Sequence, residues 1–289
     1  EAIDSVLAQT FQDWELIFWD NQSSDNSAKI LQSYEDERIQ YYLSEKFTSL
    51  GEARNQAIMK SKGEFIAFLD CDDLWMLDKL EKQIPLFNDS KVGLVICDTY
   101  FFNEKGVFKQ LYKKNKPPVG NVFSELLGEY FVSLETAVIR RTALNSLDHW
   151  FDQRFDVIEE YDLFVRLGYS WQLSYVDEVL AKWRVHGISW TWSRGELFPE
   201  ERKLMLDKLR GMIPNFEVLY TEEIKQIERI CSLEEAQIEW KERNNATARR
   251  LLEPYKTSGL KWFLTYYLTW FPYRWFQKLQ RWRGVTHPT

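Results

Sequence analysis

The sequence predicts an α/β protein with a doubly wound, mostly parallel sheet flanked by helices, followed by a helical C-terminal extension. Two observations predict this class. Apolar runs of strand length alternate with helical segments through the first part of the chain, which is the order that a parallel doubly wound sheet requires. After Phe198 the chain changes to charged, amphipathic segments with helical spacing. We therefore expect a sheet domain over residues 1–195 and a helical extension over residues 196–289.

The sheet domain opens with a segment of amphipathic-helix pattern over residues 1–10. Apolar runs then favour strands, because β-branched and aromatic residues are enriched there and turn residues bound each run. We expect these strands over residues 14–19, 38–43, 65–70, 92–102, 131–141 and, in shorter pieces, 171–186. Helical patterns lie between them over residues 28–34, 51–60, 74–87, from 142 and from 159. A lysine-rich stretch with two prolines, residues 105–120, predicts a mobile loop.

The strongest chemical signal is residues 65–75, FIAFLDCDDLW. An unbroken apolar run before a polar cluster is typical of a strand buried on both faces, and open α/β sheets bind ligands where such strands end. Asp70, Asp72 and Asp73 follow that strand, and their mutual repulsion is costly unless a cation or hydrogen-bond donors offset it. Carboxylates suit Mg²⁺ or Mn²⁺, which also bind phosphate oxygens. The simpler alternative is that the cluster caps the next helix.

A second acidic cluster, Glu159, Glu160 and Asp162, lies at the start of a predicted helix. Such residues are favoured there by the helix dipole, but a carboxylate separate from a metal site also suits a general base. Arg54 lies near the start of its own helix, where its guanidinium could reach a diphosphate or could simply be solvated. His186 is one of three histidines, and a lone histidine is more often structural than a ligand.

Composition excludes one class of partner. The net charge of −7 argues against a nucleic-acid binder, which normally carries a basic stripe. The three cysteines match neither a zinc site nor a disulfide framework, so we expect a reducing compartment and a cytoplasmic protein. No stretch reaches the roughly 18 to 20 uninterrupted apolar residues of a spanning helix.

Taken in order, four segments resemble the family 2 inverting glycosyltransferases with the GT-A fold. The resemblance covers about residues 1–190, and the segment with the DxD motif is its most specific part. The segments are AIDSVLAQTFQDWELIFWDNQSSDNS, LGEARNQAIMKSKGEFIAFLDCDDLWMLDKL, IEEYDLFVRL and WRVHGIS.

The resemblance implies a role for each acidic cluster. The DxD carboxylates of the family hold Mn²⁺ or Mg²⁺ against the diphosphate of a nucleotide-sugar, and here they fall on Asp70, Asp72 and Asp73. His186 matches a third metal or diphosphate contact. The catalytic base of the family is usually an Asp preceded by a Glu; in this chain the position is Glu160, with Asp162 as the second candidate.

The resemblance also implies the nucleotide contacts and the reaction. Asp20 and Asn21 follow the strand whose end contacts the nucleotide base in the family, and Arg54 neighbours the nucleotide. The implied activity moves a sugar to an acceptor hydroxyl with inversion, in cell-surface polysaccharide or glycolipid synthesis, on a saccharide or lipid-linked saccharide acceptor. Two alternatives stay open: an inactive carbohydrate- or nucleotide-binding module of the same fold, and another metal-dependent phosphotransfer enzyme. The family's first strand would precede Glu1, so we expect this sequence to be a fragment of a longer chain.

The tail, residues 259–284, combines many aromatic residues with lysine and arginine and is interrupted by Pro272. This composition is typical of a helix that lies in an anionic membrane surface, and here it predicts peripheral contact with the inner face of the membrane. The alternative is a helix docked on the protein's own core.

Overall fold

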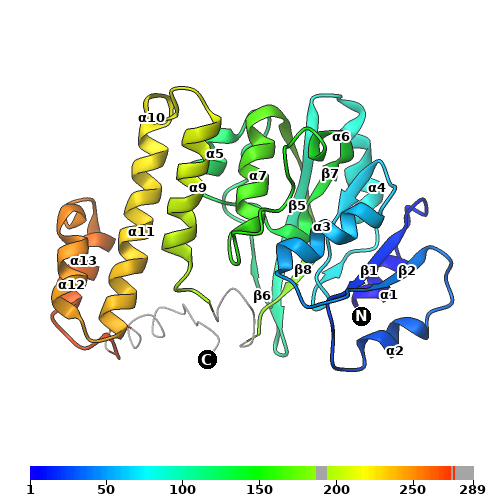
Figure 1. Cartoon of the computed structure of the whole chain (residues 1–289), viewed down its shortest axis with the longest axis horizontal. Helices are drawn as coiled ribbons and strands as arrows, with labels where there is room; N and C mark the ends of the chain where they lie inside the picture. The colour runs from blue at the N-terminus through cyan, green and yellow to red at the C-terminus, as the bar shows by residue number, and fades with distance from the viewer. Residues whose placement is uncertain (187–193, 275, 277–289) are drawn as a thin grey trace. The chain divides into compact units, whose positions relative to one another are not determined.

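The computed structural model describes residues 1–186, 194–274 and 276 of the chain (Figure 1). The last part of the predicted tail, residues 277–284, therefore lies outside the described residues. The described residues form two compact units. The first contains Glu1–Leu126 and Tyr130–Val185, and the second contains Leu127–Glu129 and the described residues from His186 onward. The predicted boundary at residues 195 and 196 lies a short way further along the chain and stays a prediction.

Most strands of the first unit overlap the predicted apolar runs, and β4 and β6 lie outside them. They are β1 (Leu16–Asp20), β2 (Ile39–Leu43), β3 (Phe65–Ala67), β4 (Leu74–Trp75), β5 (Val92–Asn103), β6 (Gly106–Gln110), β7 (Val138–Arg140) and β8 (Gln172–Arg184). Strand β6 forms a hairpin with β5 inside the stretch that was predicted to be a mobile loop. Strand β3 ends before Asp70, so the aspartates lie in the loop that follows the strand.

Helices connect these strands. They are α1 (Ala2–Leu7), α2 (Ser27–Gln32), α3 (Leu50–Lys60), α4 (Lys79–Gln83), α6 (Arg141–Leu144) and α7 (Glu159–Ser170), with 3₁₀ turns η1 (Ile84–Asn88) and η2 (Leu134–Thr136). Helix α5 (Phe123–Gly128) starts in the first unit and ends in the second. The single helix predicted over residues 74–87 is instead β4, α4 and η1. Pro85, which has no backbone N–H to donate, lies at the start of η1.

The α/β class is confirmed, but the strand pairing is more mixed than predicted. Strands β1 and β2 form a parallel two-stranded sheet, and a six-stranded sheet has the order β3-β7-β5-β8-β4 with β6 on β5. In the larger sheet only β5 and β8 pair in parallel. Strand β7 lies antiparallel to both β3 and β5, so β3 and β5 still run in the same direction. A pattern of apolar residues cannot distinguish such an inserted antiparallel strand from a parallel one.

Strand β5 is the centre of the larger sheet. Val95, Ile96 and Cys97 are completely buried, as expected for a strand covered on both faces. Leu80 of α4 and Phe87 of η1 pack against its apolar side chains. Two further helices of the first unit, α6 and α7, also contact β5.

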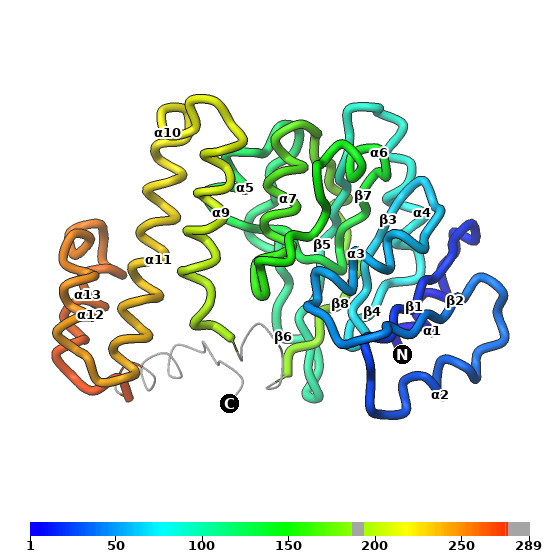
Figure 2. Tube along the Cα trace, viewed as in Figure 1, coloured from blue at the N-terminus to red at the C-terminus, as the bar shows by residue number. Residues whose placement is uncertain are grey.

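The second unit is helical, as predicted. It contains α9 (Phe198–Met212), α10 (Phe216–Leu219), α11 (Thr221–Lys241), α12 (Asn245–Leu252), the turn η3 (Glu253–Tyr255) and α13 (Leu260–Leu268). Helix α11 lies beside both α9 and α12 (Figure 2). Trp240 is buried in a core with Leu233, Ala236, Ala248 and Leu252, and its indole N–H donates to the Phe271 carbonyl at 2.8 Å. Over the described residues, no helix combines the length and the apolarity that crossing a bilayer requires.

Gly93 of β5 gives a test of this packing. A Cβ atom at this position would lie 2.6 Å from the Cβ of Trp171, so a substitution must push a bulky ring out of place. We expect Gly93→Ala to lower the free energy of unfolding by about 1–3 kcal/mol, the usual cost of overpacking a core. Urea unfolding followed by circular dichroism measures this change.

Gly211→Ala is the control for that substitution. Gly211 is exposed in α9 and has no atom within 4 Å of the added Cβ, so the change should be neutral or stabilising by up to about 1 kcal/mol. Equal stability of Gly93→Ala and the parent protein would contradict the packing of Trp171 against β5.

Candidate active site

The turn after β1 is organised by two of the predicted nucleotide contacts. Asp20 is buried, and its carboxylate accepts hydrogen bonds from the Ser23 N–H at 2.7 Å and the Tyr41 hydroxyl at 2.8 Å. Burial alone would raise the pKa of Asp20, but these hydrogen bonds outweigh it and hold the pKa below its usual range. Asn21 donates to the Thr48 carbonyl at 2.9 Å and accepts from the Thr48 N–H at 3.1 Å. Both side chains therefore fix the shape of the turn.

Arg54 is the residue that joins separate segments into one site. Its buried guanidinium donates to Glu159 Oε1 at 2.8 Å and to Asp70 Oδ1 at 3.1 Å, and the Phe151 ring lies 5.5 Å from its central carbon. Burial would lower the pKa of Arg54, but the nearby carboxylates raise it above its ordinary value. The arginine is therefore always charged, and it connects α3, the loop after β3 and the start of α7.

Helix α3 presents Arg54 at this point for a local reason. The Ser49 hydroxyl caps the helix by accepting the Glu52 N–H at 3.3 Å, which fixes the first turn. Gly51 follows the cap, and a Cβ there would lie 3.2 Å from the Phe151 Cβ, so a small residue lets the helix approach the loop before α7. The Arg54 side chain thereby reaches carboxylates on two other segments.

Glu160 lies beside this ion-pair network. It is half-buried, and the Tyr130 hydroxyl donates to its Oε1 at 3.2 Å. Burial raises the pKa of Glu160 to about 8; Arg54 opposes the rise, and Glu159 and Asp70 add to it. A carboxylate with a raised pKa next to a second acidic group is typical of a catalytic base. The influence of Asp70 on Glu160 indicates that the loop after β3 with Asp70, Asp72 and Asp73, here called the acidic loop, and the start of α7 share one region.

Two aspartates of the acidic loop, Asp70 and Asp72, are both partly exposed. The side chain of Asp70 is 47% exposed, although one edge of it is bound by Arg54, and Asp72 is half-buried. Desolvation of the Cys71 thiol raises its pKa to about 11, and Asp70, Asp72, Asp25 and Asp20 add to the shift. The turn after β1 therefore lies within electrostatic range of the acidic loop.

Asp73 differs from its neighbours. Its carboxylate is buried and accepts the Arg184 N–H of β8 at 2.8 Å. Burial and the adjacent Glu135 raise the pKa of Asp73 to about 9. Asp70 and Asp72 are more accessible than Asp73, and the predicted metal-ligand role of Asp73 stays a prediction. His186 belongs to the second unit, and its predicted contact with the metal or diphosphate stays a prediction.

Asp162 is part of a structural ion pair. Its carboxylate is completely buried and accepts two hydrogen bonds from Arg166, from Nε at 2.9 Å and from Nη2 at 2.7 Å. Arg166 also donates to the carbonyl of His149 at 2.7 Å and to that of Trp150. Asp162 therefore holds the segment before α7 in place, and Glu160 is the more accessible of the two candidates for the base.

Asp162 also belongs to a group that has metal-ligand spacing. One ligand atom each from His149, Asp152 and Asp162 lies within 4.8 Å of the others. However, Arg154 Nη2 lies 2.6 Å from Asp152, and Arg166 Nη2 lies 2.7 Å from Asp162. An arginine is already paired with each of the two carboxylates, which disfavours a divalent cation here. Asp70 and Asp72 are the better candidates for a cation.

Two residues of the site were not among the residues predicted from the sequence. Tyr130 contacts Glu160 from thirty residues away, outside any of the motifs. Arg184 lies two residues before His186, and its Nε donates to the Asp72 carbonyl at 2.8 Å, which fixes the acidic loop from β8. Neither contact could be inferred without knowing which segments pack together.

The chain is similar to known glycosyltransferases. It is 32% identical over 155 residues to the UDP-Glc:alpha-D-GlcNAc-diphosphoundecaprenol beta-1,3-glucosyltransferase WfgD of Escherichia coli, a match that covers 54% of this chain and 60% of WfgD. The chain therefore spans about three fifths of the length of this curated relative.

Two solved structures share the fold. The mannosyltransferase PcManGT from Pyrobaculum calidifontis, in complex with GDP-Man and Mn²⁺, matches with a TM-score of 0.62 and 16% identity over 96% of this chain and 79% of its own. S. aureus TarS 1-349 in complex with UDP-GlcNAc matches with a TM-score of 0.61 and 20% identity over 80% of this chain and 66% of its own. The predicted GT-A-type fold is thereby confirmed.

A family model described as "Glycosyl transferase family 2" matches residues 1–148, which is about half of the 289 residues. This match includes the acidic loop and Arg54 and ends just before the segment that leads into α7. The chain belongs to glycosyl transferase family 2.

Proposed function

We propose that this protein is an inverting glycosyltransferase that moves a sugar from a nucleotide-diphosphate sugar to an acceptor hydroxyl. The observation that carries the proposal is the Arg54 bridge, because one buried guanidinium links Asp70 of the acidic loop to Glu159, the neighbour of Glu160. A donor-binding loop and a candidate base are therefore held in one site. Membership of the family supports the inverting stereochemistry.

The acidic loop suits a divalent metal. Asp70 and Asp72 offer hard carboxylate oxygens at the end of a strand, and Mn²⁺ or Mg²⁺ held there would neutralise charge on the departing diphosphate. The Mn²⁺ in the PcManGT complex supports this choice of cofactor. Arg184 holds the loop through the Asp72 carbonyl, and Asp20 and Asn21 shape the turn proposed to receive the nucleotide base.

Glu160 is the proposed general base. Its carboxylate takes the proton of the acceptor hydroxyl as that oxygen bonds to the anomeric carbon, while the bond from that carbon to the diphosphate oxygen breaks. The displacement occurs in one step from the face opposite the leaving group, so the anomeric centre inverts. Tyr130 holds the carboxylate in place through its 3.2 Å hydrogen bond.

The relatives favour a class of donor and acceptor. WfgD is named for UDP-Glc and a diphosphoundecaprenol-linked acceptor, and TarS was solved with UDP-GlcNAc. We infer a nucleotide-sugar donor and a saccharide or lipid-linked saccharide acceptor, in the synthesis of a cell-surface polysaccharide or glycolipid.

The second unit carries a surface suited to peripheral membrane contact. One stripe of α13 and the residues after it exposes six large apolar side chains with helical spacing: Leu260, Phe263, Leu264, Tyr267, Trp270 and Phe271. The opposite face of α13 packs on the Trp240 core through Trp262 and Tyr266. One face of α13 therefore packs on the protein's own core, and the other face is exposed and suits membrane contact. Both interpretations of the tail have support. Exposed Lys261 and Arg274 flank the stripe, and positive charge favours an anionic bilayer surface.

Replacing the base tests the chemistry. Glu160→Gln keeps the shape of the side chain but cannot accept a proton, so we expect kcat to fall by ~10² to 10⁴ while nucleotide binding changes little. Turnover of a radiolabelled donor and a thermal-shift titration with nucleoside diphosphates and Mn²⁺ measure the two quantities. Glu64→Gln, at an exposed carboxylate of the same unit, is the matched control. Full turnover by Glu160→Gln would exclude Glu160 as the base.

The raised pKa of Glu160 predicts the pH dependence. Only the deprotonated carboxylate accepts a proton, so kcat/KM should rise with pH through about 8 and level off above it. Two pH units below that value roughly one group in a hundred is ionised, which predicts a fall of about a hundredfold at pH 6. Tyr130→Phe removes a hydrogen bond to the carboxylate and should move the profile to higher pH. A flat profile between pH 6 and 9 would contradict the assignment.

A deletion of the tail would also remove the Phe271 carbonyl, which accepts a hydrogen bond from the buried Trp240. Point substitutions in α13 therefore test membrane contact better than a deletion. We expect Phe263→Glu and Trp270→Glu to weaken binding to phosphatidylglycerol vesicles at least tenfold, since each places a charge on the apolar stripe. Val218→Glu is the control, because Val218 is 78% exposed in the same unit but lies outside the stripe. Vesicle flotation measures the binding, and equal binding by all variants would exclude this surface.

A further inference from the structure

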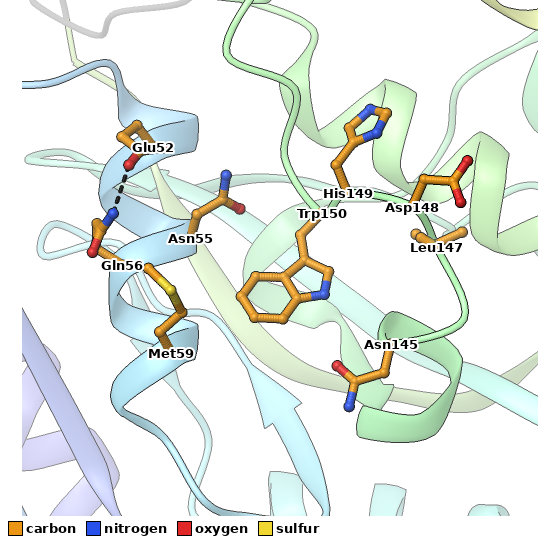
Figure 3. Close-up of a pocket in the computed structure, with 9 residues that line it drawn as sticks. All are labelled: Glu52, Asn55, Gln56, Met59, Asn145, Leu147, Asp148, His149 and Trp150. Carbon is orange, nitrogen blue, oxygen red and sulfur yellow. Dashed lines mark hydrogen bonds between the residues drawn. The ribbon is translucent and has the colours of Figure 1, made fainter.

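The first unit has a surface hollow that the proposed reaction does not use. It has a volume of about 480 Å³ and lies between one face of α3 and residues 145–150 (Figure 3). Glu52, Gln56 and Met59 line it from the helix, and Asn145, Asp148 and Trp150 line it from the facing segment. The volume is within the range of about 300–1,000 Å³ that small-molecule sites occupy.

The hollow is distinct from the active site. The α3 residues that line it are spaced along one side of the helix, whereas Arg54 is buried and faces Glu159 and Asp70. The Phe151 ring packs against the Arg54 guanidinium, and Phe151 directly follows Trp150. Neither Arg54 nor Phe151 lines the hollow.

Hydrogen bonds from two helices, α3 and α7, fix the segment that carries Trp150. Asn55 donates to the Phe151 carbonyl at 2.9 Å and accepts the Phe151 N–H at 3.0 Å, which ties the segment to α3. Arg166 donates to the carbonyls of His149 and Trp150, which ties the same segment to α7. The backbone at Trp150 is thus fixed by its neighbours, so the hollow is formed before any ligand arrives.

The Trp150 side chain contributes little to that structure. Figure 3 shows its ring directed into the space between α3 and the segment. The ring is half-buried, and its indole N–H forms no hydrogen bond with any residue that the structure describes. Tryptophan normally finds a partner for this donor or leaves it to a wet interface. Met59, 56% exposed, adds an apolar surface nearby.

Two polar side chains that line the same hollow are also available. The side chains of Asn145 and Asp148 are exposed and make no hydrogen bond or ion pair within the described part of the chain. Together they offer an amide, which donates and accepts, and a carboxylate, which accepts two hydroxyl groups. A hollow lined by an aromatic face and by planar polar side chains matches a sugar ring, whose C–H face is apolar and whose rim carries hydroxyls.

We propose that this hollow is a second saccharide-binding site, in which a sugar ring stacks on Trp150 and its hydroxyls bond to Asn145, Asp148 and the indole N–H. The inference rests on the proposed function, because an enzyme of saccharide synthesis meets sugar chains as acceptor and as product. The site holds the chain away from the reacting centre, and it takes neutral sugar units without a nucleotide or a metal.

Binding without donor tests the site. The full chain is titrated, with no nucleotide and no metal, with two probes: an acceptor-type oligosaccharide that ends in N-acetylglucosamine, and the same oligosaccharide extended by one glucose. We expect Trp150→Ala to weaken the binding of at least one probe tenfold or more, and Asn145→Ala and Asp148→Asn to weaken it several-fold. Trp150→Phe should retain part of the affinity, because the stacking face stays. Tighter binding of the shorter or of the extended probe identifies acceptor or product as the ligand.

Phe47→Ala is the matched control, since Phe47 is a 68% exposed aromatic residue of the same unit that does not line the hollow. Binding that is equal in Trp150→Ala and the parent chain, or absent in the parent for both probes, overturns the proposal. Glu160→Gln separates this result from the proposed function: it should bind both probes as the parent does while losing transfer. If the parent chain transfers sugar but no probe binds at Trp150, only the second site is refuted. If a probe binds at Trp150 but the parent chain transfers no sugar, the proposed function is refuted.

Discussion

The buried guanidinium of Arg54 is the constraint on which the rest of the site depends. A charge removed from water is tolerated only when opposite charges compensate it, and here Asp70 and Glu159 do so from two different segments. Three carboxylates, those of Asp70, Glu159 and Glu160, lie near the Arg54 guanidinium, so their negative charge exceeds its single positive charge. This excess of negative charge, together with burial, keeps the pKa of Glu160 high. The same interaction therefore links the acidic loop to the start of α7 and limits the rise in the pKa of the proposed base.

Much of the fold could be predicted from the sequence because apolar runs and turn residues are local signals. The runs located β1, β2, β3, β5 and β8, and the charged amphipathic pattern located the helices of the second unit. The direction of β7 could not be predicted, since an apolar strand looks the same whichever way it runs. The hairpin of β5 and β6 was missed because its second strand is exposed and lies in a lysine-rich stretch.

The site was predicted in part for a similar reason. The acidic loop and Glu160 lie in compact motifs, whereas the partners of Arg54 are 16 and 105 residues away. Neighbouring aspartates also look equivalent in a sequence, yet Asp73 turns into the protein and Asp70 does not. The sequence does contain one signal for the role of Asp162: Arg166 lies four residues after it, the spacing at which opposite charges pair along a helix. That spacing indicates a structural aspartate.

Helix α13 has a property that matters for how a protein attaches to a surface. A segment of nine residues is too short to be a stable helix alone in water, so free tails of this kind usually fold only when they bind and lose affinity to the entropy of ordering. Here the Trp240 core already holds the helix in shape, with its apolar side outward. The proposed membrane contact would therefore lose little free energy to the ordering of this helix.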